Sequence, residues 1–163
     1  MNARSAIAPI LRRLVVAGLL VAFLSFTSLA AAAVKVVEPS VVASNVAGKS
    51  ITVTVDSYGV GTWSGSAFVG GNHVFLGEAA YRDAERGGGV GLFLLLHETG
   101  HTTGIADEHA ADCYSLAHVK AALRAFWPLP SASINKRYED ALAWPGKYAG
   151  NYCLHTAAGT SRL

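Results

Sequence analysis

Two histidines and a glutamate near the middle of the chain have the spacing of a metal site. Residues 97–101 read His-Glu-Thr-Gly-His and end an apolar stretch that begins at about Val90. If this stretch is a helix, His97 and His101 lie one turn apart on the same face and can bind one metal ion. Glu98 then lies about 100° further round the helix, within reach of a water bound to that ion. The pattern favours hydrolysis by a metal-activated water, with Glu98 as the general base.

The residues that follow His101 resemble a motif of the gluzincins, a group of zinc peptidases. Residues 108–112 read Glu-His-Ala-Ala-Asp, which is similar to the E-x-x-A-D motif on the second helix of that group. The resemblance implies that Glu108 is the third zinc ligand. It also implies that Asp112, on the same helix face, hydrogen-bonds a ligand histidine and orients it. Glu108 follows His101 by only seven residues, so the two helices must be joined by a very tight turn.

Asp107 is the alternative third ligand. Residues 97–107 resemble the metzincin layout H-E-x-x-H-x-x-G-x-x-H, with aspartate in the last position as in the snapalysin-type variant. In that reading Gly104 turns the chain and Asp107 returns to the metal. Metzincins also have a methionine in a turn below the zinc, whereas the only methionine here is Met1. The metzincin layout is therefore incomplete, and we prefer Glu108.

The segments around the motif predict an α+β domain. Alternating β-branched residues predict a strand over 51–56, and two further strands are expected over 62–69 and 73–77. The turns between these strands predict a short antiparallel meander. We interpret residues 34–46 as an extended lead-in that could form a strand. Helices are expected over 78–86, 90–103, 108–127 and 131–144.

A short strand, a short helix and an apolar helix that ends in the histidine motif together resemble a compact zincin. The resemblance covers about 72–123 and implies a small zincin-like domain. It also implies that strand 74–76 edges the cleft and pairs with an extended peptide. The expected activity is cleavage of peptide or protein substrates with Zn2+ as cofactor. The alternative is a non-catalytic, exported zinc-binding protein with a degenerate peptidase fold and a closed zinc site.

Residues 1–33 have the layout of a secretory signal peptide. Three arginines precede an apolar run over 14–26, and four alanines follow at 30–33. This pattern predicts cleavage at the end of the alanine run and export to the cell envelope, the periplasm or the medium. The alternative is an uncleaved membrane anchor, because 14–34 is about long enough to span a bilayer. Membrane association is expected only in that case.

Residues 34–163 form the expected mature domain, about 130 residues with room for one core. Three of the 13 basic residues and none of the 11 acidic residues lie in 1–33, so the formal charge of the remainder is −1. The domain is not basic, so no nucleic-acid partner is expected. We expect a monomer. Cys113 and Cys153 both lie in this domain, and export predicts a disulfide between them.

Overall fold

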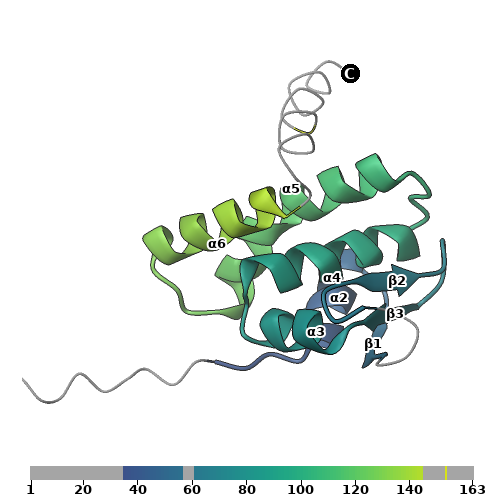
Figure 1. The fold of residues 1–163 in the computed structure, drawn as a ribbon, viewed down its shortest axis with the longest axis horizontal. Coiled ribbons are helices and arrows are strands. Elements are labelled where there is room, and N and C mark those ends of the chain that lie inside the picture. The colour runs from purple at the N-terminus through teal and green to yellow at the C-terminus, as the bar shows by residue number, and fades with distance from the viewer. Residues whose placement is uncertain (1–34, 57–60, 145–152, 154–163) are drawn as a thin grey trace, which may run out of the picture. The chain divides into compact units, whose positions relative to one another are not determined.

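The computed structural model describes residues 35–56, 61–144 and 153, all within the compact unit Val34–Leu163. They form an α+β fold with five helices and a three-stranded sheet (Figure 1). The predicted signal peptide at 1–33 lies outside the described residues. Within the described ranges, no helix is long and apolar enough to cross a membrane. The elements are α2 (Pro39–Ala47), β1 (Thr52–Val55), β2 (Gly65–Ala67), β3 (His73–Leu76), α3 (Glu78–Glu85), α4 (Gly89–Thr102), α5 (Glu108–Phe126) and α6 (Ser131–Ala143).

The four helices predicted from periodicity and capping residues occur where they were expected, as α3, α4, α5 and α6. Between α4 and α5 the chain turns at Gly104, whose φ of +103° is a backbone conformation that favours glycine. Asp107 then caps α5, since its side chain accepts a hydrogen bond of 2.7 Å from the backbone N–H of Ala110. The proline-rich segment after Phe126 ends α5 because proline cannot continue a helix.

The predicted extended lead-in at 34–46 is wrong, because most of it forms helix α2. Pro39 lies in the first turn, where its missing N–H costs nothing, and Gly48 ends the helix with a φ of +66°. Val42 and Ala43 are fully buried, and α2 packs on β1 and α4. This burial outweighs the preference of the β-branched residues for a strand.

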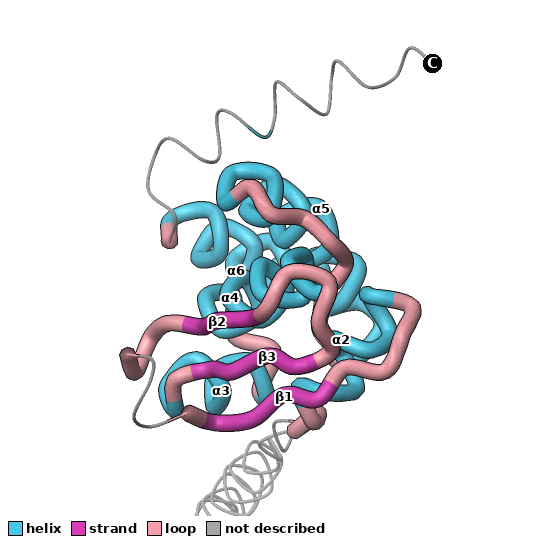
Figure 2. The backbone as a smooth tube through the Cα atoms, turned by 90° about the vertical axis from the view of Figure 1, so that its right-hand side faces the viewer, coloured by secondary structure: helices cyan, strands magenta, loops and turns pink. Residues whose placement is uncertain are grey.

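The predicted antiparallel meander is also wrong in part, because the sheet is mixed. Its strand order is β1-β3-β2 (Figure 2). Strand β1 is parallel to β3, and β2 is antiparallel to β3. The turn at 70–72 makes the expected hairpin between β2 and β3, but β2 lies on the far side of β3 and not beside β1. Val74 and Leu76 of β3 are fully buried, whereas Gly-Ser-Ala in β2 offers little apolar surface. The apolar strand therefore takes the centre and the small polar strand takes the edge.

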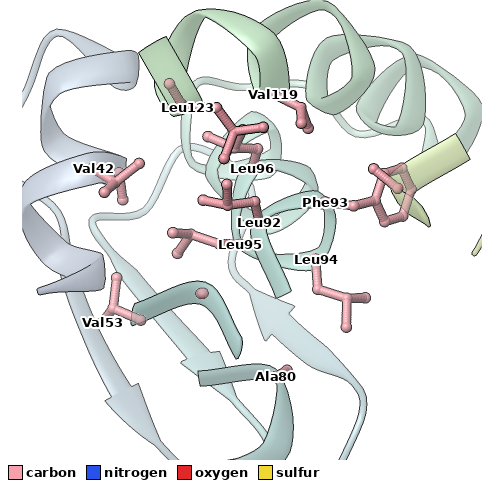
Figure 3. Packing of buried hydrophobic residues seen from close by; sticks show 14 of the residues in the cluster. Val42, Val53, Ala80, Leu92, Phe93, Leu94, Leu95, Leu96, Val119 and Leu123 are labelled. Atoms are coloured by element: carbon pink, nitrogen blue, oxygen red, sulfur yellow. The ribbon is translucent and has the colours of Figure 1, made fainter. Parts of the chain in front are cut away.

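Helix α4 is the centre of the fold and is buried almost all round. It contacts α2, α3, α5, α6, β2 and β3. Its side chains meet those of the surrounding elements in one core (Figure 3). Close approach of α3 to α4 requires glycine at position 91, because a Cβ there would lie 2.3 Å from the backbone nitrogen of Ala84. The leucines of α4 that are fully buried are Leu92, Leu95 and Leu96.

The C-terminal half of the domain packs α5 and α6 against α4 and against each other. The predicted disulfide is confirmed, since Cys113 on α5 is bonded to Cys153. It joins residues 40 positions apart. Because Cys113 directly follows Asp112, this bond fastens Cys153 to the first turns of the helix that carries the acidic motif.

Candidate metal centre

Helix α4 presents His97 and His101 on one face near its C-terminal end, as the i, i+4 spacing predicts. Their Nε2 atoms are 3.1 Å apart, and their rings meet edge to face. Both imidazoles are largely enclosed, with side-chain exposures of 12% for His97 and 8% for His101. Two ring nitrogens thus lie side by side on a helix that is buried in the core.

Glu108 is the carboxylate that meets this histidine pair. Its Oε2 lies 3.0 Å from Nε2 of His97, and its Oε1 lies 3.6 Å from Nε2 of His101. The alternative candidate, Asp107, instead uses its carboxylate to cap α5 through Ala110. The tight turn demanded by the short spacing is present, with the Ile105 N–H bonded to the Gly100 carbonyl. Glu108 therefore joins His97 and His101 as a group that could hold a metal ion.

The other ring nitrogens of the histidines face hydrogen-bond acceptors. Nδ1 of His97 lies 2.8 Å from Oδ1 of Asp112, and Nδ1 of His101 lies 2.7 Å from the carbonyl oxygen of Ile105. A carbonyl and an ionised carboxylate only accept, so each Nδ1 must carry the proton. In neutral imidazoles both Nε2 atoms then present lone pairs to each other and to Glu108. These lone pairs and the carboxylate repel one another unless a proton or a metal ion lies between them, so the group is suited to hold a cation.

The spacing of the candidate ligand atoms is close to that around a small metal ion. Tetrahedral coordination at about 2.0–2.1 Å requires ligand atoms roughly 3.3 Å apart. Here the two nitrogens are 3.1 Å apart. Oε2 of Glu108 lies 3.0 Å from Nε2 of His97, and its other oxygen, Oε1, lies 3.6 Å from Nε2 of His101. Glu108 has a side-chain exposure of 76%, so the group is enclosed on the α4 side and open on the other.

Glu98 lies beside this group and is 6% exposed. Burial raises the pKa of its carboxyl, the two histidines lower it, and Glu108 raises it. A carboxylate with a raised pKa is a stronger base than one in water. Strand β2 covers Glu98: a Cβ on Gly65 would lie 2.7 Å from its Cγ and 3.0 Å from its Oε1. Only glycine lets β2 approach this closely.

Two hollows open on either side of Glu98 and Gly65. One, of about 370 Å3, has His97, Asp112 and Trp63 in its wall. The other, of about 250 Å3, has His101 and Glu108 in its wall. The candidate metal group and the buried carboxylate are therefore reached from a cleft that runs between α4 and the edge strand β2.

Sequence reasoning misidentified the strand at this cleft. The expected edge strand, 74–76 in β3, lies in the middle of the sheet and is paired on both sides. The edge strand at this cleft is β2, and the glycine within it makes room for Glu98. The carbonyl of Ile105, which orients His101, was also missed, because no side-chain pattern marks a backbone acceptor. The small-residue composition of β2 is the signal that could have revealed the close approach.

Comparison with known proteins gives no relative: no family model, no curated protein and no solved structure matches the chain.

Proposed function

We propose that the chain is an exported, zinc-dependent endopeptidase of zincin type. The observation that carries the proposal is the convergence of two imidazole nitrogens and a carboxylate next to a buried glutamate, in an open cleft. His97, His101 and Glu108 hold the zinc, and Asp112 orients His97. This arrangement matches the gluzincin-like motif better than the snapalysin-type one, because Glu108, and not Asp107, meets the histidines.

Zinc is the proposed metal because of the ligand set. Catalytic zinc sites use this donor set, which consists of two histidines and one carboxylate with one side left open. The Nδ1 hydrogen bonds of both histidines fix the tautomer that leaves Nε2 for the metal. Bound there, the ion supplies a Lewis acid that polarises a peptide carbonyl and acidifies a water.

Glu98 moves the proton in this mechanism. It lies next to the metal ligands, and burial raises the pKa of its carboxyl, so it accepts a proton from the attacking water. It then delivers that proton to the nitrogen of the leaving amine. Gly65 of β2 contacts Glu98 and limits its movement, which keeps the carboxylate directed at the reacting atoms.

The edge strand supplies a means of binding an extended peptide. The Gly77 N–H bonds to the Ser64 carbonyl over 2.9 Å, and backbone direction alternates along an antiparallel strand. The backbone groups of Gly65 and Ala67 therefore point away from β3, toward the cleft side of the sheet. A peptide that pairs with this edge lies across Glu98 and the metal ligands. The disulfide supports the export part of the proposal, since such bonds persist in oxidising compartments.

The decisive experiment replaces the base and keeps the ligands. Zinc content and cleavage of casein are measured for the purified wild type, for Glu98→Gln, and for Glu139→Gln on the exposed face of α6. We expect one zinc per chain in all three. Cleavage should be inhibited by a zinc chelator and should fall at least about 100-fold in Glu98→Gln alone.

Two outcomes would overturn the proposal. Stoichiometric zinc without cleavage of any unfolded protein would favour the non-catalytic zinc-binding alternative. Full activity of Glu98→Gln would show that another group acts as the base.

A further inference from the structure

Two large exposed aromatic side chains meet at the cleft. Trp63 precedes β2 and Trp144 follows α6, and each is 43% exposed. Their ring centroids are 5.9 Å apart, and the ring planes are tilted by 43°. The third tryptophan, Trp127, is 3% exposed. Exposed tryptophan surface is unfavourable in water, so a pair of such residues in one place indicates a contact surface.

This tryptophan pair, Trp63 and Trp144, lies directly beside the candidate metal centre. Both residues line the 370 Å3 hollow that also contains His97 and Glu98. Both also line a second hollow of about 460 Å3 on their other side, with Val90 among its walls. The two hollows share both tryptophans, and we call the two hollows together the groove. Its 370 Å3 part contains His97, so a molecule bound at the metal that occupies this part would contact the tryptophans.

The charged groups of the second hollow are already engaged within the protein. The Asp83 carboxylate accepts a 2.7 Å hydrogen bond from the Gly91 N–H, and Arg137 donates to the carbonyl oxygens of Arg86 and Gly87. Asp140 is paired with Lys136 at 3.2 Å. Recognition along this part of the groove is consequently left to the apolar faces of the tryptophans.

We propose that the tryptophan pair, Trp63 and Trp144, binds a large apolar side chain of the substrate and so sets a preference for such a residue close to the cleaved bond. This rests on the proposed peptidase function. The 370 Å3 hollow has the size of a small-molecule site, about 300–1,000 Å3, which suits a phenylalanine, leucine or methionine side chain. Trp63 and Trp144 are specificity-determining residues in this scheme and do not take part in the proton transfer.

The activity test compares substrates that differ in one side chain. Cleavage of a peptide mixture, read by mass spectrometry, identifies the preferred residue near the cut. The ratio of kcat/KM for that peptide to kcat/KM for its glycine counterpart is then measured. We expect a bulky apolar preference, and we expect Trp63→Ala and Trp144→Ala each to lower the ratio about tenfold or more. Trp63→Phe and Trp144→Phe should each keep most of the wild-type ratio. Phe68→Ala, which removes another exposed aromatic residue, serves as the matched control.

A binding test measures the contribution of the tryptophan pair in the absence of catalysis. Zinc-loaded Glu98→Gln protein is titrated with blocked pentapeptides that carry phenylalanine or glycine at the centre, and tryptophan emission is followed. The phenylalanine peptide should shift the emission at a concentration at least about tenfold lower than the glycine peptide. The shift should vanish in the double variant Trp63→Ala, Trp144→Ala, because Trp127 is buried and does not report on the groove.

The outcomes separate the two proposals. An emission shift without cleavage of any substrate would overturn the peptidase function and support the binding of apolar side chains by the tryptophan pair. Cleavage with no side-chain preference, or a ratio that Trp63→Ala and Trp144→Ala leave unchanged, would overturn the role of the tryptophan pair alone.

Discussion

Asp112 on α5 accepts a 2.8 Å hydrogen bond from Nδ1 of His97 on α4. This one contact joins the two helices that carry the candidate ligands, and it fixes which nitrogen of His97 is available to a metal. Asp112 has a side-chain exposure of 17%, so water competes weakly for the bond. The contact ties the geometry of the metal group to the packing of α5 on α4.

Removal of this contact should weaken metal binding without abolishing it. We expect Asp112→Ala to lower zinc affinity about 10–100-fold, as loss of a hydrogen-bond partner of a ligand histidine does. Asp112→Asn should lower zinc affinity less, because the amide oxygen can still accept the hydrogen bond from His97. Competition with a fluorescent zinc chelator measures both. Asp140→Asn on α6 is the control, and an affinity of Asp112→Ala equal to that of the wild type would contradict the prediction.

The third ligand can be tested by a pair of adjacent substitutions. Glu108→Ala should lower zinc affinity by more than about 100-fold, since it removes a ligand and not merely a partner of one. Asp107→Ala should instead cost about 1 kcal/mol of stability by removing the α5 cap. Zinc competition and urea unfolding separate the two effects. The reverse result, with zinc lost only in Asp107→Ala, would restore the snapalysin-type arrangement.

The close contact between β2 and Glu98 predicts that a single methyl group impairs catalysis. In Gly65→Ala the new Cβ meets Glu98 at 2.7 Å, so the carboxylate or the strand must move. We expect kcat/KM on a peptide substrate to fall by about 100-fold, the effect of a displacement of about 1 Å. Zinc binding should persist because the three ligands lie elsewhere. Ser131→Ala, at the exposed start of α6, should keep its activity; equal losses in both variants would argue against the contact.

The disulfide predicts a large and specific stability effect. Loss of a cross-link between residues 40 positions apart should lower the free energy of unfolding by about 4 kcal/mol. Cys113→Ser, Cys153→Ser and the double variant should lose the same amount, because each removes the same bond. Urea unfolding under non-reducing conditions provides the measurement. A double variant as stable as the wild type would show that the bond does not form in solution.

Much of the candidate site could be predicted from local spacing. The positions of His97, Glu98 and His101 on one helix follow from a period of 3.6 residues, and the Asp107 cap follows from local hydrogen-bonding rules. The helices were found because their apolar periodicity and caps agree. The strand order could not be predicted in this way, because pairing depends on which strand buries most apolar surface. That comparison involves the whole core and not any one segment.

The sequence by itself therefore determined the candidate ligand types, their helix and the α+β class. Only the tertiary structure decided which carboxylate meets the histidines, since Asp107 and Glu108 are neighbours with the same charge. The turn at Gly104 and the docking of α5 on α4 direct Glu108 inward and leave Asp107 at the cap. The tertiary structure also brought β2 and the tryptophan pair to the cleft. Such contacts join residues distant in sequence, and their energies depend on shape and burial that no local pattern encodes.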